Sequence, residues 1–482
     1  MNAVSKNFIG GQWVAGGGTS RNVNPSDISD IVGEYAQGNE AQALEAIAAA
    51  KNAFPAWSHS TPQQRYDVLS RVSAEILSRK DELGRLLSRE EGKTLPEGIG
   101  EVTRAGQIFA FFAGEALRIS GQHGSSVRPG VEVDLTREPI GVVGIICPWN
   151  FPIAIPAWKI APALCYGNCV VFKPADLVPG CGFALAEIIA KSGLPDGVFN
   201  LVMGRGSVVG QALLTHRDVS AISFTGSAAT GRKIAEACIS ATPMKKFQLE
   251  MGGKNPLVIL DDANIDVAVE SALNGAFFST GQRCTASSRL IVTQGIHDKF
   301  VAALIKRLEA TVVDNALKPG THIGPVVDQS QLDQNLSYVA VGKDEGARLV
   351  FGGERLERTT KGFYMQPALF TETTSAMRIS REEIFGPVAN VIRARGYDEA
   401  LAIANDTEFG LAAGICTTSL KYATHFKRDS EAGMVMVNLP TAGVDYHVPF
   451  GGRKGSSYGA REQGSYAQEF YTVVKTAYML PG

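Results

Sequence analysis

Two side chains able to do covalent chemistry stand 34 positions apart in this sequence, Glu250 and Cys284. Glu250 precedes the pair Gly252–Gly253, and Cys284 lies in Gly281–Arg289, a stretch of small and polar residues. A thiol nucleophile and a carboxylate that activates water are the minimum set for covalent catalysis with a general base. Each residue also has an ordinary alternative, because free cysteines usually pack in cores and glutamates usually lie at the surface or in salt bridges.

A third candidate, Asn150, follows the apolar run Ile140–Cys147 within the segment Pro148–Pro152. The apolar run predicts a buried strand, and ligands bind at the carboxyl ends of strands in doubly wound sheets. An amide N–H there is suited to holding an oxyanion. The alternative is an asparagine that caps the following helix.

A glycine turn at Phe224–Gly231 joins a predicted strand to a predicted helix. Helix N-termini bind phosphate through their free N–H groups. The turn lacks the Lys-Ser/Thr of a Walker motif, which favours a dinucleotide pyrophosphate. Lys173–Asp176, at the end of another strand, could bind ribose or phosphate, or could be ordinary solvated charge.

Short apolar strands alternate with helices around these candidates, which predicts parallel sheets covered on both faces. The expected strands are 140–147, 169–172, 199–202, 221–224, 257–260 and 288–292. The expected helices are 152–165, 180–191, 207–214, 227–239, 265–279 and 297–312.

The remaining segments have other patterns. Helical spacing predicts helices over Pro62–Gly92 and Pro96–Ile119, and Phe8–Val14 predicts a strand, turn and strand. Val127–Pro139 alternates apolar and polar residues, as in a half-exposed strand, and has no local hairpin partner in the sequence. We expect it to pair elsewhere, as could Phe470–Tyr478, the predicted final strand.

Composition limits the function classes. The chain has 482 residues, 45% hydrophobic and 20% charged, with a net charge of −2, so it offers no electrostatic case for nucleic acid or an anionic membrane. Seven cysteines, an odd number without a Cys-x-x-Cys pair, argue against a metal site or a disulfide framework. The N-terminal residues show no signal-peptide pattern and no apolar run is long enough to span a bilayer, so we expect a cytoplasmic protein.

Together these segments resemble the aldehyde dehydrogenase superfamily over essentially the whole chain. The matching pieces are Pro148–Pro152, Lys173–Asp176, Phe224–Ser227, Leu249–Lys254, Gly281–Cys284, Glu383–Pro387 and Pro449–Gly452. The resemblance implies an α/β, aldehyde dehydrogenase-like fold. It would contain a Rossmann-type parallel-sheet dinucleotide-binding domain (1–120 and 140–250), an α/β catalytic domain (251–450) and small β oligomerisation strands (121–139 and 465–482).

The resemblance also implies residue roles. The catalytic residues would be Cys284 as nucleophile, Glu250 as the base for thioester hydrolysis, Asn150 as oxyanion donor, and Lys173. The cofactor NAD, and possibly also NADP, would be bound by Ile146, Pro148, Trp149, Lys173, Asp176, Gly206, Gly210, Phe224, Thr225, Gly226, Ser227, Glu250, Glu383 and Phe385. The substrate would be bound by Phe151, Trp158, Phe278, Arg283, Cys284, His447 and Phe450.

Two departures from the family pattern bear on these roles. Met251 replaces the usual leucine, a near-isosteric change of little consequence. Asp176 replaces the glutamate usual in NAD-preferring members, and its shorter side chain leaves room near Lys173 for a 2′-phosphate. We therefore expect NAD with some use of NADP.

Within the superfamily the chain looks most like the dehydrogenases of α-ketoglutaric semialdehyde (2,5-dioxopentanoate). An acidic aldehyde needs a cation or donors at its binding site, and Arg283 and His447 are the candidates, against a salt bridge and a loop histidine as alternatives. Other semialdehydes or broader aldehydes, a CoA-acylating enzyme and an inactive homologue remain competitors. Glu250 argues against the CoA-acylating class, because members of that class resemble this sequence but have a non-acidic residue at the position of Glu250. The strands predicted at Val127–Pro139 and Phe470–Tyr478 fit the family's intersubunit sheet, so the resemblance implies a homodimer or homotetramer.

Overall fold

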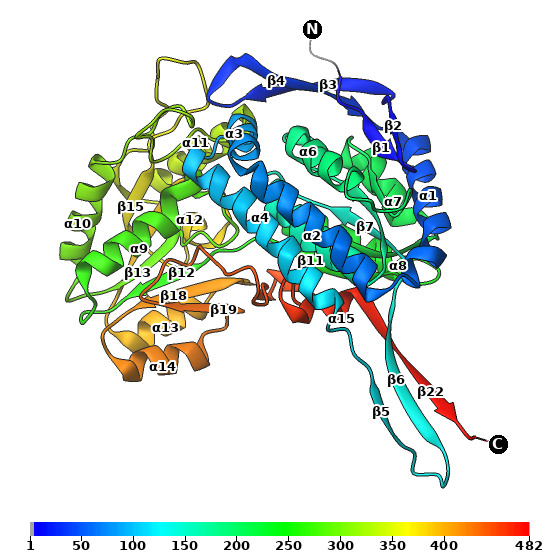
Figure 1. Cartoon of the computed structure of the whole chain (residues 1–482). Coiled ribbons are helices and arrows are strands. Elements are labelled where there is room, and N and C mark those ends of the chain that lie inside the picture. The colour runs from blue at the N-terminus through cyan, green and yellow to red at the C-terminus, as the bar shows by residue number, and fades with distance from the viewer. Residues whose placement is uncertain (1–3, 482) are drawn as a thin grey trace.

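The computed structural model describes residues 4–481, and its architecture is mixed α/β (Figure 1). It contains an eight-stranded sheet, built mostly before Glu250, and a seven-stranded sheet built after it. A separate three-stranded sheet projects from the body. These features confirm the expected fold class.

The eight-stranded sheet has the order β2-β1-β9-β8-β7-β10-β11-β21, and the strands from β9 to β11 are parallel. Because β7 lies between β8 and β10, the chain winds away from β7 in both directions, and such a switch point opens a crevice at the carboxyl ends of the strands. The strands are β1 (Asn7–Ile9), β2 (Gln12–Val14), β7 (Val142–Ile146), β8 (Cys169–Lys173), β9 (Phe199–Leu201), β10 (Val219–Thr225), β11 (Lys246–Glu250) and β21 (Ser457–Tyr458).

Helices surround this sheet, and α4 packs against α2, α3 and α5. Three of them begin with a capping box, in which Asn39, Thr61 and Thr94 exchange bonds with the residue three positions later. The helices are α1 (Glu40–Ser58), α2 (Pro62–Ser78), α3 (Lys80–Glu91), α4 (Leu95–Ala116), α5 (Ala154–Cys165), α6 (Pro179–Ala190), α7 (Gln211–Thr215) and α8 (Ala228–Ser240).

Two of the helices expected before Glu250 need correction. The single helix expected over Pro62–Gly92 is two helices, because Arg79 leaves the helical conformation with φ −102° and ψ 15°. The helix expected over Ser207–Leu214 begins as a π-turn, η1 (Gly206–Gly210), before α7. Uniform helical periodicity does not reveal such local breaks.

The seven-stranded sheet has the order β14-β15-β16-β13-β12-β18-β19, and all neighbouring strands except β14 and β15 are parallel. Its strands are β12 (Pro256–Ile259), β13 (Arg289–Thr293), β14 (Arg348–Phe351), β15 (Ala368–Thr373), β16 (Val388–Ala394), β18 (Ala412–Cys416) and β19 (Met434–Val437). Its helices are α9 (Ile265–Phe277), α10 (His297–Glu309), α11 (Gln329–Asp344), α12 (Arg378–Arg381), α13 (Tyr397–Asn405) and α14 (Leu420–Asp429).

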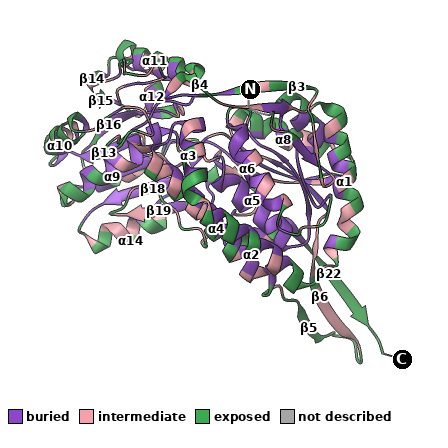
Figure 2. Ribbon diagram, turned by 45° about the horizontal axis from the view of Figure 1, so that its top comes forward, coloured by how far each residue is buried: buried purple, intermediate pink, exposed green. Residues whose placement is uncertain are grey.

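The projecting sheet joins β5 (Gln122–Ser125), β6 (Glu132–Pro139) and β22 (Thr472–Met479). The expectation that β6 lacks a local hairpin partner is wrong, because β5 pairs with it antiparallel. The final strand starts two residues later than expected, since α15 (Gln468–Tyr471) occupies its first positions. Most of β22 is exposed (Figure 2).

Two short ribbons complete the described strands: β3 (Gly18–Asn24) with β4 (Asp27–Gln37), and β17 (Phe409–Gly410) with β20 (Arg453–Lys454). Within residues 4–481, no helix combines the length and apolarity needed to cross a bilayer.

Candidate active site

Several predicted site residues form a row at the carboxyl ends of neighbouring strands. The register pairs Thr225 of β10 with Glu250 of β11, and it pairs Phe224 with Ile146 of β7. Ile146 in turn pairs with Lys173 of β8. The sheet thus gathers residues from four strands at the switch point, where ligands bind in open α/β sheets.

A first cavity, of about 320 Å³, lies beside this row and is called the strand-end cavity below. Ser227 lies on it and caps α8, accepting a hydrogen bond from the Thr230 N–H at 3.3 Å. The free N–H groups and dipole of this helix start favour an anion. The predicted residues that line the cavity are Pro148, Trp149, Asn150, Thr225, Gly226, Ser227, Cys284, Glu383 and Phe385.

Other predicted cofactor residues lie along the same edge but outside that lining. Lys173 pairs with Asp176 at 3.0 Å, where Asp176 is partly exposed. A Cβ on Gly206 would stand 3.7 Å from Lys173 Cε, and one on Gly210 would stand 3.8 Å from Ile146 Cδ1, so these residues form a neighbouring strip. Phe224 and Glu250 are buried in the sheet edge itself.

The paired glycines after Glu250 are required by close packing. A Cβ on Gly252 would stand 2.2 Å from a carboxylate oxygen of Glu383, and one on Gly253 would stand 2.6 Å from the Cys284 carbonyl oxygen. The Gly253 N–H donates to Glu383 at 2.8 Å. Burial raises the pKa of Glu383 to about 7. The glycines therefore let Glu383 and the Cys284 segment approach the same turn.

Two glutamines not singled out from the sequence line the strand-end cavity from α11. Gln331 Nε2 donates to the carbonyls of Ile384 and Phe385 at 3.0 and 3.1 Å, and Gln334 Nε2 donates to that of Ile384 at 2.9 Å. These bonds hold Phe385 at φ +59°, with its ring edge-on to Trp149 at 5.4 Å. A left-handed phenylalanine is strained, and such strain collects at functional sites.

Cys284 follows a strained turn rather than a helix. The helix expected to reach Ser279 ends at Phe277, and Ser279 and Thr280 adopt φ values of 49° and 56°. Burial and, to a smaller extent, the charges of Glu250 and Glu383 raise the pKa of the Cys284 thiol to about 12, against the opposing effect of the N–H groups of Cys284 and Thr285. The resting thiol is therefore protonated at neutral pH and must lose its proton to act as a nucleophile.

Asn150 is buried and fixed from both sides. Its Nδ2 donates to the Gln282 backbone carbonyl at 3.0 Å, and the Asn150 backbone carbonyl accepts from the Lys93 ammonium. Lys93 also pairs with Glu101 at 3.1 Å and lies 3.9 Å from the Phe151 ring centroid. The amide is thus held close to the Cys284 segment by residues of the α3–α4 region, which the sequence did not single out.

The Glu250 carboxylate points to Ser457, whose hydroxyl donates to Oε2 at 2.6 Å. Burial raises the pKa of Glu250 well above its ordinary value, nearby Glu462 raises it further, and the Ser457 bond lowers it. Glu250 lines neither the strand-end cavity nor the second cavity described next.

A second cavity, also about 320 Å³, opens on the other side of Cys284 and is called the tunnel cavity. Of the residues predicted to bind substrate, Phe151, Trp158, Arg283, Cys284 and Phe450 line it. Trp158 stacks on Phe450 with ring centroids 5.1 Å apart. Cys284 is the residue shared by the linings of the two cavities.

Two residues predicted to bind substrate, Phe278 as a wall of the tunnel and His447 as a donor at its mouth, lie outside the tunnel lining. Phe278 packs against the core of the second sheet, because the turn after α9 directs it there. His447 is exposed on its loop, with its ring against Tyr446 at 5.3 Å. Loop composition alone did not fix these directions.

Arg283 lines the tunnel but already has hydrogen-bond and ion-pair partners. It pairs with Glu97 at 3.2 Å, and its Nη1 donates to the carbonyl and side-chain oxygens of Asn274 at 3.3 and 3.1 Å.

A second arginine, Arg104 of α4, lines the same cavity and was not predicted from the sequence. The available signal was a charged residue three positions after Glu101, within the apolar face that includes Ile108.

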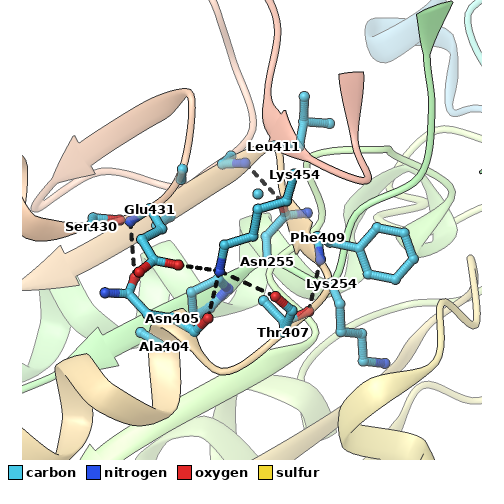
Figure 3. A pocket seen from close by; sticks show the side chains of 15 residues that line it. Lys254, Asn255, Ala404, Asn405, Thr407, Phe409, Leu411, Ser430, Glu431 and Lys454 are labelled. Atoms are coloured by element: carbon cyan, nitrogen blue, oxygen red, sulfur yellow. Dashed lines mark hydrogen bonds and ion pairs between the residues drawn. The ribbon is translucent and has the colours of Figure 1, made fainter. Parts of the chain in front are cut away.

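Asn255 ties the nucleophile segment to the second sheet. Its Nδ2 donates to the carbonyls of Cys284 and Ala286 at 2.8 and 2.9 Å, and its Oδ1 accepts from the Ala412 N–H at 2.9 Å. It borders a small void of about 10 Å³, where Lys454 reaches the Asn405 carbonyl at 2.6 Å (Figure 3). A void of this size holds about one water, so this region is structural support.

Comparison with known proteins agrees with this geometry. The family model described as "Aldehyde dehydrogenase family" matches residues 13–477. The chain is 45% identical to an α-ketoglutaric semialdehyde dehydrogenase of Bacillus subtilis (strain 168), over 98% of each chain. It is 42% identical to an α-ketoglutarate semialdehyde dehydrogenase of Haloferax volcanii, over 99% of each.

Among solved structures, betaine aldehyde dehydrogenase from Staphylococcus aureus in complex with NAD+ superposes with a TM-score of 0.95. It is 34% identical, and the match covers 98% of this chain and 94% of that one. Two cavities that meet at one thiol, together with these matches, confirm the resemblance stated from the sequence: the chain belongs to the aldehyde dehydrogenase family.

Proposed function

We propose that this protein oxidises an aldehyde to a carboxylic acid with NAD, through a covalent intermediate on Cys284. The single observation that carries the proposal is that Cys284 lies where the strand-end cavity and the tunnel cavity meet. A nucleophile placed there can hold a substrate from one side within reach of a cofactor from the other.

The strand-end cavity and its neighbouring strip fit a dinucleotide. Lys173 and Asp176 would address the adenosine ribose, Ser227 the pyrophosphate, and Glu383 with Phe385 the nicotinamide side. Pro148, Trp149, Thr225 and Gly226 would line the same path, with Ile146, Phe224, Gly206 and Gly210 beneath it. When bound, NAD supplies a hydride acceptor. The helix start capped by Ser227 and the close approach allowed at Gly252 support this fit.

The proposed reaction has two stages, formation of a thioester on Cys284 and hydrolysis of that thioester. The Cys284 thiol gives its proton to a water molecule as its sulfur bonds to the aldehyde carbon and the carbonyl π bond breaks, while the Asn150 amide and the Cys284 N–H stabilise the oxyanion of the tetrahedral adduct. Loss of hydride from that carbon leaves a thioester. The Glu250 carboxylate then takes a proton from water, the resulting hydroxide bonds to the thioester carbon, and the C–S bond breaks to release the acid. This second stage requires Glu250 to turn away from Ser457.

The substrate we propose is 2,5-dioxopentanoate, also called α-ketoglutaric semialdehyde, and the product is 2-oxoglutarate. The names of the two relatives, both dehydrogenases of this semialdehyde, support this substrate. The tunnel cavity supports it as well, because about 320 Å³ is at the small end for ligand sites and Arg104 makes it positive.

We infer further features of the working protein. The dinucleotide would bind the domain formed by 1–120 and 140–250, and 251–450 would present the nucleophile. The strands in 121–139 and 465–482 would join subunits into a homodimer or homotetramer, since β22 leaves Val473, Val474 and Tyr478 exposed. A thiol that must stay reduced fits the cytoplasm.

A kcat/KM panel with purified protein tests this proposal. It compares ω-carboxylic semialdehydes, aliphatic aldehydes and aromatic aldehydes, each with NAD and with NADP. We expect the highest value for 2,5-dioxopentanoate with NAD. We expect a lower, measurable value with NADP, because the Asp176 charge repels a 2′-phosphate while its short side chain leaves space. Equal values for all three aldehyde classes would contradict the proposed substrate.

A further inference from the structure

We infer that Arg104, rather than Arg283 or His447, binds the carboxylate of the substrate in the tunnel cavity. The inference rests on the proposed function, because it assumes that the aldehyde carries an acid group. Arg104 projects from the middle of α4 and lines the same cavity as Cys284. The aldehyde end would lie at the thiol and the acid end at the guanidinium.

The Arg104 guanidinium has unused bonding capacity. Its Nη2 donates to Gln463 Oε1 at 3.1 Å, which orients the group. Its Nε is buried and has no hydrogen-bond partner within residues 4–481, and no carboxylate lies in ion-pair contact with it in that part of the chain. A guanidinium offers five N–H donors in a planar fork that matches a carboxylate.

The nearest acid on the same helix is committed elsewhere. Glu101 pairs with Lys93 at 3.1 Å and accepts from the N–H groups of Ile153 and Ala154 at 3.0 and 3.1 Å. Burial lowers the pKa of Arg104, yet an arginine stays charged in proteins. A largely buried cation without an ion-pair partner is costly, and a bound carboxylate would offset that cost.

Arg283 differs in each of these respects. Glu97 neutralises it at 3.2 Å and Asn274 occupies its Nη1, so it bridges α4 and α9 beside the nucleophile turn. Its expected role is to hold that turn. Both arginines line the tunnel cavity, but Arg283 forms an ion pair and Arg104 forms none within residues 4–481. The two are therefore a matched pair for experiment.

The surrounding surface would select a short, acidic aldehyde. The Arg104 Cζ lies 5.8 Å from the centroid of the Trp158 ring, which stacks on Phe450. Apart from the two arginines, the described residues of the lining are uncharged. A carboxylate bound in this cavity would therefore meet the Arg104 guanidinium as the charged group of the lining that has no ion-pair partner within residues 4–481.

The test compares Arg104→Met with the matched control Arg283→Met in the full-length enzyme. Each is assayed at saturating NAD with 2,5-dioxopentanoate and with pentanal, a neutral aldehyde of the same chain length. We expect Arg104→Met to lower the ratio of the two kcat/KM values about 100-fold, mainly through the KM for the acid, since a charged hydrogen bond is lost. Arg104→Lys should lose about 10-fold, because it keeps the charge without the fork. Arg283→Met should lower both values by similar factors.

A binding measurement gives a second readout. Glutarate is used as a competitive inhibitor of pentanal oxidation, and its inhibition constant should rise at least about 10-fold in Arg104→Met. Similar losses for acid and neutral aldehydes in Arg104→Met, or a selective loss confined to Arg283→Met, would overturn the inference. A wild-type enzyme without preference for 2,5-dioxopentanoate over pentanal would contradict the proposed substrate instead, and the glutarate constant would then decide the role of Arg104.

Discussion

The two cavities that meet at Cys284 have similar volumes, each about 320 Å³, but they are built differently. The strand-end cavity is formed by turns at the ends of β7, β10 and β11 and carries the acid Glu383. The tunnel cavity is formed by side chains from α4, α5 and α9 with a loop near Phe450, and it carries two arginines. One is shaped by backbone geometry and the other by side-chain identity.

This difference separates the consequences of substitution. Where backbone approaches a ligand or another chain segment, even an added methyl group changes the site. Where side chains from distant helices define the wall, a change of charge alters which substrate is accepted while the frame remains. Cys284, which lies where the two cavities meet, should instead act on the chemical step itself.

The largest effect should come from the shared residue. Cys284→Ala removes the nucleophile, so kcat should fall by at least about 10,000-fold. NAD affinity, measured by fluorescence titration, should stay within about threefold, because the strand ends that form the other cavity are untouched. NADH formation at a near wild-type rate in this variant would refute the covalent mechanism.

Glu250→Gln should separate the two chemical stages. The turnover rate should fall about 1,000-fold because the amide cannot take a proton from water. A single rapid burst of NADH, about one per active site, should remain in stopped-flow measurements because acylation uses Cys284 and Asn150. A burst that disappears together with turnover would place Glu250 in the first stage.

Gly252→Ala tests the backbone-built side of the comparison. Its Cβ would stand 2.2 Å from Glu383, so we expect the KM for NAD to rise about 30-fold. The expected change in the KM for aldehyde is within about threefold. Gly396→Ala is the matched control, since its Cβ would meet nothing within 4 Å. Equal effects on both KM values would show that the cavities are not independent.

The smallest effect should be a displacement of the pH profile. The Ser457 hydroxyl lowers the pKa of Glu250 by donating to its charged form, so Ser457→Ala should raise that pKa further. A raised pKa leaves less carboxylate at a given pH, and the rising limb of kcat should move about half a unit to higher pH. A move to lower pH would mean that the hydroxyl does not stabilise the carboxylate.

Much of the strand-end cavity could be predicted from short stretches of the sequence. The apolar run before Asn150, the glycine turn at Ser227 and the Gly252–Gly253 pair each sit where a strand ends, and parallel strands bring such ends to one edge. The break at Arg79 and the β5 partner of β6 escaped prediction, because a periodic pattern does not specify where a helix is interrupted or which strand pairs.

By itself, the sequence determined the alternation of strands and helices, the family, and the candidate set of Cys284, Glu250 and Asn150. These depend on patterns within short windows and on their order. Only the tertiary structure decided that Arg283 is engaged, that Phe278 and His447 lie outside the tunnel lining, and that Arg104 lines the tunnel with an Nε that has no hydrogen-bond partner within residues 4–481. Those outcomes depend on which side chains from distant helices meet, and burial and pairing between such elements are not encoded in any one stretch of chain.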